Sequence, residues 1–237
     1  KNNKVNKVSK IKAVISPHAG YTFSGPCMSH VFYELSTIKT PDTYIIIGLS
    51  HYGHSTCLSD QDFKTPLGIL ENNSMLTTKI SKECNITVNN SSHSQEHSLE
   101  VLLPFLQFVK PDEDIRIVPL IVGQESLGDI KKIGNLLKKT IKDYAKEVVI
   151  LVSSDFTHHG PNYGYMPSKD IKEMDMKAIN LIKEAKTEEL YNYHQETGIT
   201  ICGIYPIMML LESIDFKKSD LLCYYKSTEI MKFDEDN

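Results

Sequence analysis

Three short apolar runs in the sequence each end in a polar turn that carries histidine or aspartate. Their length and their content of β-branched residues are typical of strands that are buried on both faces. In open α/β sheets such strands run parallel, and ligands bind at their carboxyl ends. The sequence therefore predicts one site where several strand ends meet. The runs and the polar residues behind them are residues 13–16 with His18, residues 44–49 with His51, and residues 148–152 with Asp155, His158 and His159.

Strand-like runs alternate with helix-like segments along the chain. This alternation predicts an α/β fold, an αβα sandwich whose mostly parallel central sheet is covered by helices on both faces. Residues 1–10 are basic and polar, so we expect a loose N-terminal end there. No repeat or shift in composition divides the rest of the chain, so we expect a single α/β domain over residues 11–237. The predicted strands are residues 11–16, 43–48, 116–122, 148–152 and 220–225, with a small β-excursion over 56–70. The predicted helices are residues 28–35, 74–84, 97–108, 125–144, 168–185, 187–196 and 206–211, with a turn over 20–26 and a mobile polar loop over 88–92.

Composition narrows the class of protein. The net charge is −4, and acidic and basic residues are mixed along the chain, so no basic face for nucleic acid is indicated. No apolar run approaches the roughly 18 residues that a membrane span needs. The five cysteines are odd in number and form no CxxC pair, which is typical of reduced thiols in an intracellular protein. We therefore expect a cytoplasmic protein, with the nucleus as a second compartment.

His18, His51 and Cys202 are the candidate metal ligands. Cys202 lies between Gly198 and a buried helix, and a helix N-terminus lowers the pKa of a thiol. Two imidazoles and one thiolate suit zinc, copper or ferrous iron, and they leave a coordination position open. The alternative for Cys202 is a buried apolar thiol, the commonest role of a free cysteine. The spacing along the chain does not show that the three side chains meet.

Other polar residues near these runs are candidates for proton transfer or for orienting a ligand. Asp155 would orient a ligand histidine or would act as a helix cap or turn residue. His158, with His159 beside it, is a candidate general acid or base, because imidazole titrates near neutral pH. Glu96 and His97 would form a polar wall of the site or a solvated helix start. Three further histidines lack such a context and are predicted to lie at the surface: His54, His93 and His194.

Six blocks of the sequence resemble the Memo family (mediator of cell motility). The resemblance implies a fold similar to class III extradiol dioxygenases of the LigB type. It also implies metal ligands at His18, His51 and Cys202, an acid/base histidine at His158, and pocket-lining residues at Asp155 and His97. The blocks are residues 17–25 (PHAGYTFSG), 48–51 (GLSH), 96–105 (EHSLEVLLPF), 119–123 (PLIVG), 153–158 (SSDFTH) and 201–203 (ICG).

The resemblance leaves several functions open. A His/His/Cys pocket for iron or copper, or alternatively zinc, would belong to a signalling or cell-motility adaptor with metal-dependent redox activity. The same pocket would suit a dioxygenase-like oxidoreductase, although a thiolate in place of the usual glutamate ligand argues against ordinary catechol cleavage. A zinc hydrolase that uses His158 is a third alternative. An adaptor would bind a protein or phosphopeptide partner, for which the sequence offers no arginine cluster.

Overall fold

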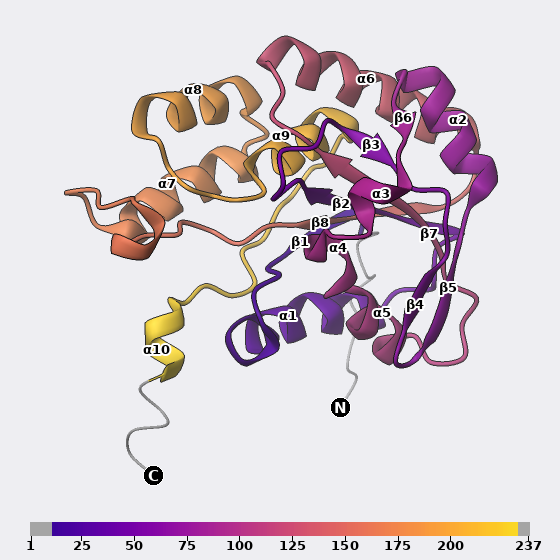
Figure 1. Ribbon diagram of the computed structural model, residues 1–237, viewed down its shortest axis with the longest axis horizontal. Coiled ribbons are helices and arrows are strands. Elements are labelled where there is room, and N and C mark those ends of the chain that lie inside the picture. Colours follow the sequence, from indigo (N-terminus) through magenta and orange to yellow (C-terminus); the bar gives the residue numbers. More distant parts are fainter. Residues whose placement is uncertain (1–10, 232–237) are drawn as a thin grey trace, which may run out of the picture.

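The computed structural model describes residues 11–231, and the predicted loose end over residues 1–10 lies outside this range. An eight-stranded sheet lies between two layers of helices (Figure 1). Most neighbouring strands are parallel; only β3 with β7 and β4 with β5 are antiparallel. The predicted fold class is therefore confirmed. The strand order is β1 (Ala13–Ser16), β8 (Val148–Ser153), β2 (Thr43–Leu49), β7 (Arg116–Val122), β3 (Cys57–Leu58) and β6 (Thr87–Val88), while β5 (Gly68–Asn72) pairs with β7 and β4 (Phe63–Thr65) with β5.

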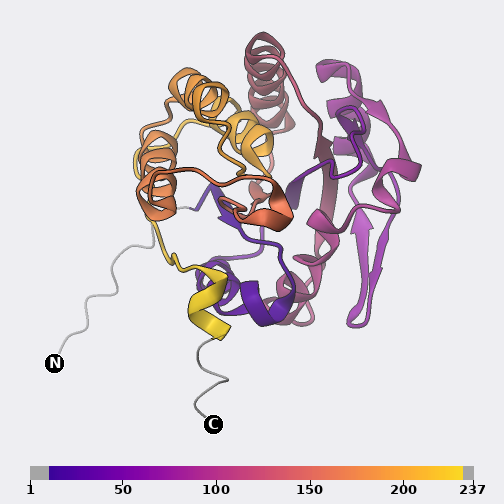
Figure 2. The same cartoon turned by 60° about the vertical axis from the view of Figure 1, so that its left-hand side comes forward.

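Helices cover both faces of the sheet (Figures 1 and 2). One face packs against α2 (Ser74–Cys84), α6 (Leu127–Tyr144), α7 (Ile171–Lys183), α8 (Thr187–Thr197) and α9 (Ile204–Ser213). The other face packs against α1 (Tyr21–Ser36), α4 (His97–Glu100) and α5 (Leu103–Val109). Three short elements complete the described chain: α3 (Asn90–His93), the 3₁₀ helix η1 (Pro161–Tyr163) and α10 (Ser227–Met231).

Strand β2 shows why a continuous apolar run suits a central strand. Ile45 and Ile47 belong to the core on the α6 and α9 side. Tyr44 and Ile46 belong to the core on the α1 and α5 side. Successive side chains of a strand point to opposite faces, so a strand with helices on both sides must be apolar at every position. Within residues 11–231, no helix is long and apolar enough to cross a membrane.

Two predicted helix boundaries are wrong, and both involve proline. Helix α1 begins at Tyr21, so the turn predicted over residues 20–26 is helical, with Pro26 inside the helix. A proline normally pushes the residue before it out of the helical region, because its ring clashes with that residue's Cβ. Gly25 has no Cβ, which relieves this clash. The helix predicted over residues 97–108 is instead divided into α4 and α5, and Pro104 lies in the first turn of α5, where a missing N–H costs least.

The strand predicted over residues 220–225 is also wrong. This segment is neither helix nor strand, and it lies along α1 and α7 instead of joining the sheet. Leu221 and Leu222 remain exposed, so the apolar pair gains no buried sheet face. The tyrosines hold the segment through their hydroxyl groups: Tyr224 Oη donates to Asp175 Oδ2 at 2.8 Å, and Tyr225 Oη donates to the Phe23 carbonyl.

The loop predicted over residues 88–92 contains the end of β6 and most of the helical turn α3, and His93, predicted at the surface, is buried. The Nε2 atom of His93 lies 3.2 Å from the Cys57 carbonyl oxygen. A carbonyl oxygen only accepts, so Nε2 carries the proton. The Nδ1 atom is buried without a hydrogen-bond partner among the described residues. Burial lowers the pKa of His93 to about 4, because a second proton would place an unpaired charge in the interior.

Stability is therefore expected to fall in acid partly through His93. The unfolded chain takes up this proton near pH 6.5, whereas the folded chain resists it down to about pH 4. The contribution of the neutral His93 to the free energy of unfolding is complete above pH 6.5 and is lost as the pH falls towards 4. The loss between pH 7.5 and pH 5 is about 2 kcal/mol. His93→Gln keeps a donor for the Cys57 carbonyl and cannot be protonated. Urea unfolding at both pH values should show a loss smaller by this amount in the variant; equal losses would contradict the prediction.

Candidate metal centre

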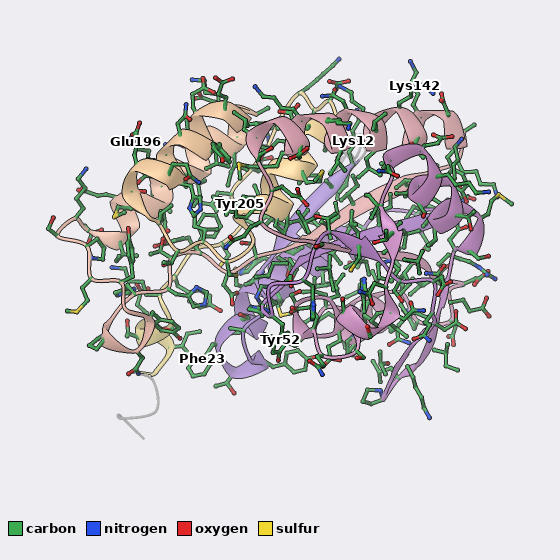
Figure 3. The ribbon with its side chains drawn as sticks, turned by 45° about the horizontal axis from the view of Figure 1, so that its top comes forward. Lys12, Phe23, Tyr52, Lys142, Glu196 and Tyr205 are labelled. Atoms are coloured by element: carbon green, nitrogen blue, oxygen red, sulfur yellow. The ribbon has the colours of Figure 1, made fainter. Side chains whose placement is uncertain are left out.

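The carboxyl ends of three neighbouring strands bring the predicted residues to one edge of the sheet. His18, Asp155 and His51 each follow their strand, β1, β8 and β2, by two residues. The strands β1 and β8 end in register, with Ser16 opposite Ser153. Lys12 and Phe23, which precede and follow β1, mark the two ends of this strand in Figure 3. The site lies at the Phe23 end.

His18 is buried, and its neighbours fix which ring nitrogen faces the site. Its Nδ1 atom lies 2.7 Å from Ser153 Oγ. Ser153 donates its only hydroxyl proton to the Ser98 carbonyl, so the hydroxyl accepts from His18 Nδ1–H. The Nε2 atom therefore carries a lone pair. Burial is the main reason that the pKa of His18 is lowered to about 4, with the charge of Asp155 opposing it, so the ring is neutral at pH 7.

His51 is oriented in the same way by Glu96. The Nδ1 atom of His51 lies 2.7 Å from Glu96 Oε1, and the backbone N–H of His51 donates to Glu96 Oε2 at 2.8 Å. The backbone N–H of Ser98 donates to the same carboxylate. Burial alone would raise the pKa of Glu96, but these hydrogen bonds together lower it to about 2. An ionised carboxylate on Nδ1–H leaves the His51 Nε2 lone pair free, the arrangement commonly found at metal-ligating histidines.

Two groups of metal-capable side chains meet at this edge, and His18 belongs to both. In the first group, ligand atoms of His18, His51 and His97 all lie within 4.8 Å of one another. The rings of His51 and His97 are stacked, with centroids 4.3 Å apart. In the second group, His18 Nε2 lies 3.5 Å from Cys202 Sγ and 3.8 Å from Asp155 Oδ2. The predicted set takes His18 and His51 from one group and Cys202 from the other.

The spacing of these atoms fits a metal ion. A tetrahedral ion with bonds of about 2.0–2.3 Å to nitrogen and sulfur places its ligand atoms about 3.3–3.6 Å apart. The 3.5 Å between His18 Nε2 and Cys202 Sγ falls in this range. The donors are imidazoles, a thiol and a carboxylate, a set that suits iron, copper and zinc.

The expectation of a low pKa for Cys202 is wrong. Helix α9 begins at Ile204, so Cys202 precedes its N-terminus by two residues. Burial, and after it the negative charge of Asp155, raise the pKa of the Cys202 thiol to about 12. The Asp155 backbone N–H donates to the sulfur at 3.2 Å, but this bond does not outweigh the burial. Without a cation beside it, the thiol stays protonated at neutral pH; a metal ion would reverse this preference.

Asp155 and His158 have different surroundings, although they are close in sequence. Asp155 Oδ1 accepts from the backbone N–H groups of His18 and Ala19, so this carboxylate also holds the turn that carries His18. His158 belongs to neither of the two groups found among the described residues. Its Nδ1 atom lies 3.3 Å from the Thr200 carbonyl oxygen, and its ring packs edge-on against Tyr163. A carbonyl oxygen only accepts, so the Nδ1 atom of His158 donates in this contact.

Glu96 and Ser153 are the residues whose roles the sequence did not reveal. Glu96 was assigned to a polar wall or a solvated helix start, yet it is 2% exposed and binds His51. One signal was present, because an acidic side chain is stabilised next to a helix N-terminus. Ser153 is the last residue of β8, and nothing in its sequence context distinguishes it from a strand residue that only packs.

Comparisons with known proteins found a matching family model, related sequences and a solved structure with the same fold. The family model described as Memo-like protein matches residues 1–236. A MEMO1 family protein of Methanosarcina barkeri is 32% identical over 225 residues, covering 93% of this chain and 81% of the relative. One from Methanococcus vannielii is 31% identical over 239 residues, covering 97% and 82%. The crystal structure of an uncharacterized protein from Escherichia coli K12 shares the fold, with a TM-score of 0.61, 14% identity and coverage of 87% and 90%.

Proposed function

The chain belongs to the Memo family, and from this premise we propose that His18, His51 and Cys202 bind a redox-active metal ion, iron or copper, with zinc as a third candidate. The observation that carries the proposal is the orientation of the two imidazoles. Ser153 and Glu96 hold the Nδ1 atoms of His18 and His51, and both Nε2 lone pairs are left for a common ligand. Metal-ligating histidines almost always have such a hydrogen-bond partner on the ring nitrogen that faces away from the metal.

Besides the three ligands, Asp155, His97 and His158 would each have a separate role at this site. A bound iron or copper ion would supply one-electron redox chemistry and an open coordination position. Asp155 would keep His18 in place through the two backbone N–H groups, and its second oxygen lies 3.8 Å from His18 Nε2. The His97 side chain is 48% exposed and stacks on His51, where it would line the entrance. His158 would take up or release a proton at Nε2.

We place redox activity ahead of the other functions. Phosphopeptide recognition usually depends on arginine. Arg116, the one arginine of the chain, lies at the start of β7 and pairs with Glu71 and Asp114. The start of β7 is at the end of the parallel strands away from the candidate centre. We also propose a reducing compartment such as the cytoplasm, since all five cysteines are free thiols.

Anaerobic metal titration tests the proposed function. We expect wild-type protein to bind ferrous iron or cuprous copper at one site per chain, and Cys202→Ser to weaken binding by at least about tenfold, because a hydroxyl is a poor substitute for a thiolate ligand. Cys84→Ser is the matched control, since Cys84 is the last residue of α2 and its thiol contacts Thr140 of α6, away from the candidate centre. It should bind like wild type.

Two outcomes would change the proposed function. Unchanged affinity in Cys202→Ser together with lost affinity in His97→Ala would assign the ion to the three histidines. Absence of binding by the wild type would reject the metal site and leave the adaptor, with a protein partner, as the function to pursue.

A further inference from the structure

The segment over residues 217–226 crosses the molecule between α9 and α10 without forming a helix or strand; we call it the strap (Figure 2). Two helices hold it from different sides. On α7, Asp175 accepts from Tyr224 Oη at 2.8 Å. On α1, the backbone N–H of Cys27 donates to Tyr225 Oη at 3.2 Å, and Tyr225 donates in turn to the Phe23 carbonyl. The strap therefore joins α7 to the first turns of α1.

Two cysteines meet where the strap lies on α1. The Sγ atom of Cys27 lies 4.0 Å from the Cys223 carbonyl oxygen, and the Cys223 side chain is close enough to affect the pKa of Cys27. Both residues are partly buried, so neither is sealed in the core. Burial is the main reason that the pKa of Cys27 is raised to about 12, and the neighbouring Cys223 side chain adds to this effect. Among the described residues, the other three cysteines interact with no second thiol: Cys57, Cys84 and Cys202.

We propose that Cys27 and Cys223 are a redox modification site, in which a hydroperoxide converts the two thiols into a disulfide that fastens the strap to α1. In the first step one thiolate attacks a peroxide oxygen, and the O–O bond breaks to give a sulfenic acid and, for hydrogen peroxide, water. In the second step the other thiol attacks the sulfenic sulfur and releases a second water. Two thiols lose two electrons and two protons, and one peroxide is reduced to two waters.

The geometry favours Cys223 as the first thiol to react. It lies on an irregular segment, while Cys27 is within a helix and its raised pKa disfavours its thiolate. Cys27 then resolves the sulfenic acid. The resulting bond joins residues 196 positions apart, so it closes almost the whole chain into one loop. A long loop gives a cross-link a large effect on the unfolded state.

The pair borders the candidate metal centre without being part of it. The negative charge of Asp155 contributes to raising the pKa of Cys27 and of Tyr225. Helix α1 follows the turn that carries His18. A disulfide would therefore fix α1, which follows this turn, relative to the strap and to α7. The modification requires no metal, so its test is independent of the proposed function.

Peroxide treatment of chelator-treated, folded protein tests the site. We expect a tryptic cross-link between the Cys27 and Cys223 peptides, with a mass lower by about 2 Da than the sum of the two reduced peptides. We also expect the melting temperature to rise by about 5–10 °C and to return on addition of dithiothreitol. Trypsin should cut more slowly after Lys217, Lys218 and Lys226 in the oxidised form.

Two variants make the result specific. Cys223→Ser should lose both the cross-link and the rise in melting temperature, whereas Cys84→Ala, which removes a thiol between α2 and α6, should keep both. Separate oxidation of Cys27 and Cys223 to sulfinic acids without a cross-link would overturn the proposal. A cross-link of either cysteine to Cys202, or between two molecules, would overturn it as well.

Discussion

His18→Ala is expected to lower the affinity for iron or copper by more than about 100-fold, the largest loss of any single substitution at the candidate centre. Changing a residue that only orients a ligand typically costs 10–100-fold, and removing a shared ligand should cost more. His18 is the one residue common to both groups of metal-capable side chains. The prediction therefore holds whether His97 or Cys202 completes the site. Competition with a chelator of known affinity gives the measurement.

The control for His18→Ala is His30→Ala, which removes an exposed imidazole from α1 and belongs to neither group. It should bind metal like wild type. Thermal unfolding with chelator present shows whether the His18 variant remains folded, since the substitution also leaves Ser153 without its ring partner. A folded variant that binds metal within tenfold of wild type would contradict a centre built on His18.

Gly203→Ala is expected to destabilise the fold by about 2–4 kcal/mol and to weaken metal binding at the same time. A Cβ at this position would lie 2.4 Å from Ser154 Cβ and 2.5 Å from the Ser153 carbonyl oxygen. These atoms belong to the end of β8 and to the turn that follows it, so they cannot swing away as a long side chain would. The chain at Gly203 must move instead, and the adjacent Cys202 moves with it.

Gly128→Ala is the matched control for this substitution. Gly128 is exposed in the first turns of α6, and an added Cβ there meets only Ser126 Oγ at 3.7 Å, an ordinary contact. Alanine should stabilise the protein by about 0.4–1 kcal/mol, because it reduces the freedom of the unfolded chain and favours the helix. Urea unfolding of both variants gives the comparison. Equal stability of Gly203→Ala and wild type would contradict the close packing of α9 on the end of β8.

The central strands could be predicted because a strand that is buried on both faces needs a continuous run of apolar residues. The runs at 43–48, 116–122 and 148–152 are apolar at nearly every position after the first, and the structure places them as β2, β7 and β8. The predictions were wrong where an element depends on its neighbours, as for the strand predicted over 220–225 and the start of α1. The exposed pair Leu221 and Leu222 resembles the start of a strand until the neighbouring helices are known. The acceptance of Pro26 within α1 likewise depends on the glycine before it.

The candidate site divides in the same way. The sequence by itself determined that His18, His51 and Asp155 follow buried strands, and parallel strands must bring such residues to one edge of a sheet. Only the tertiary structure decided that Ser153 and Glu96 fix the two histidine rings, that Cys202 is a high-pKa thiol, and that Cys27 lies against Cys223. The physical reason is how far apart in the sequence the interacting residues lie. Strand periodicity is a property of a few consecutive residues, whereas burial and hydrogen-bond partners come from segments that are distant in sequence and meet only in the folded chain.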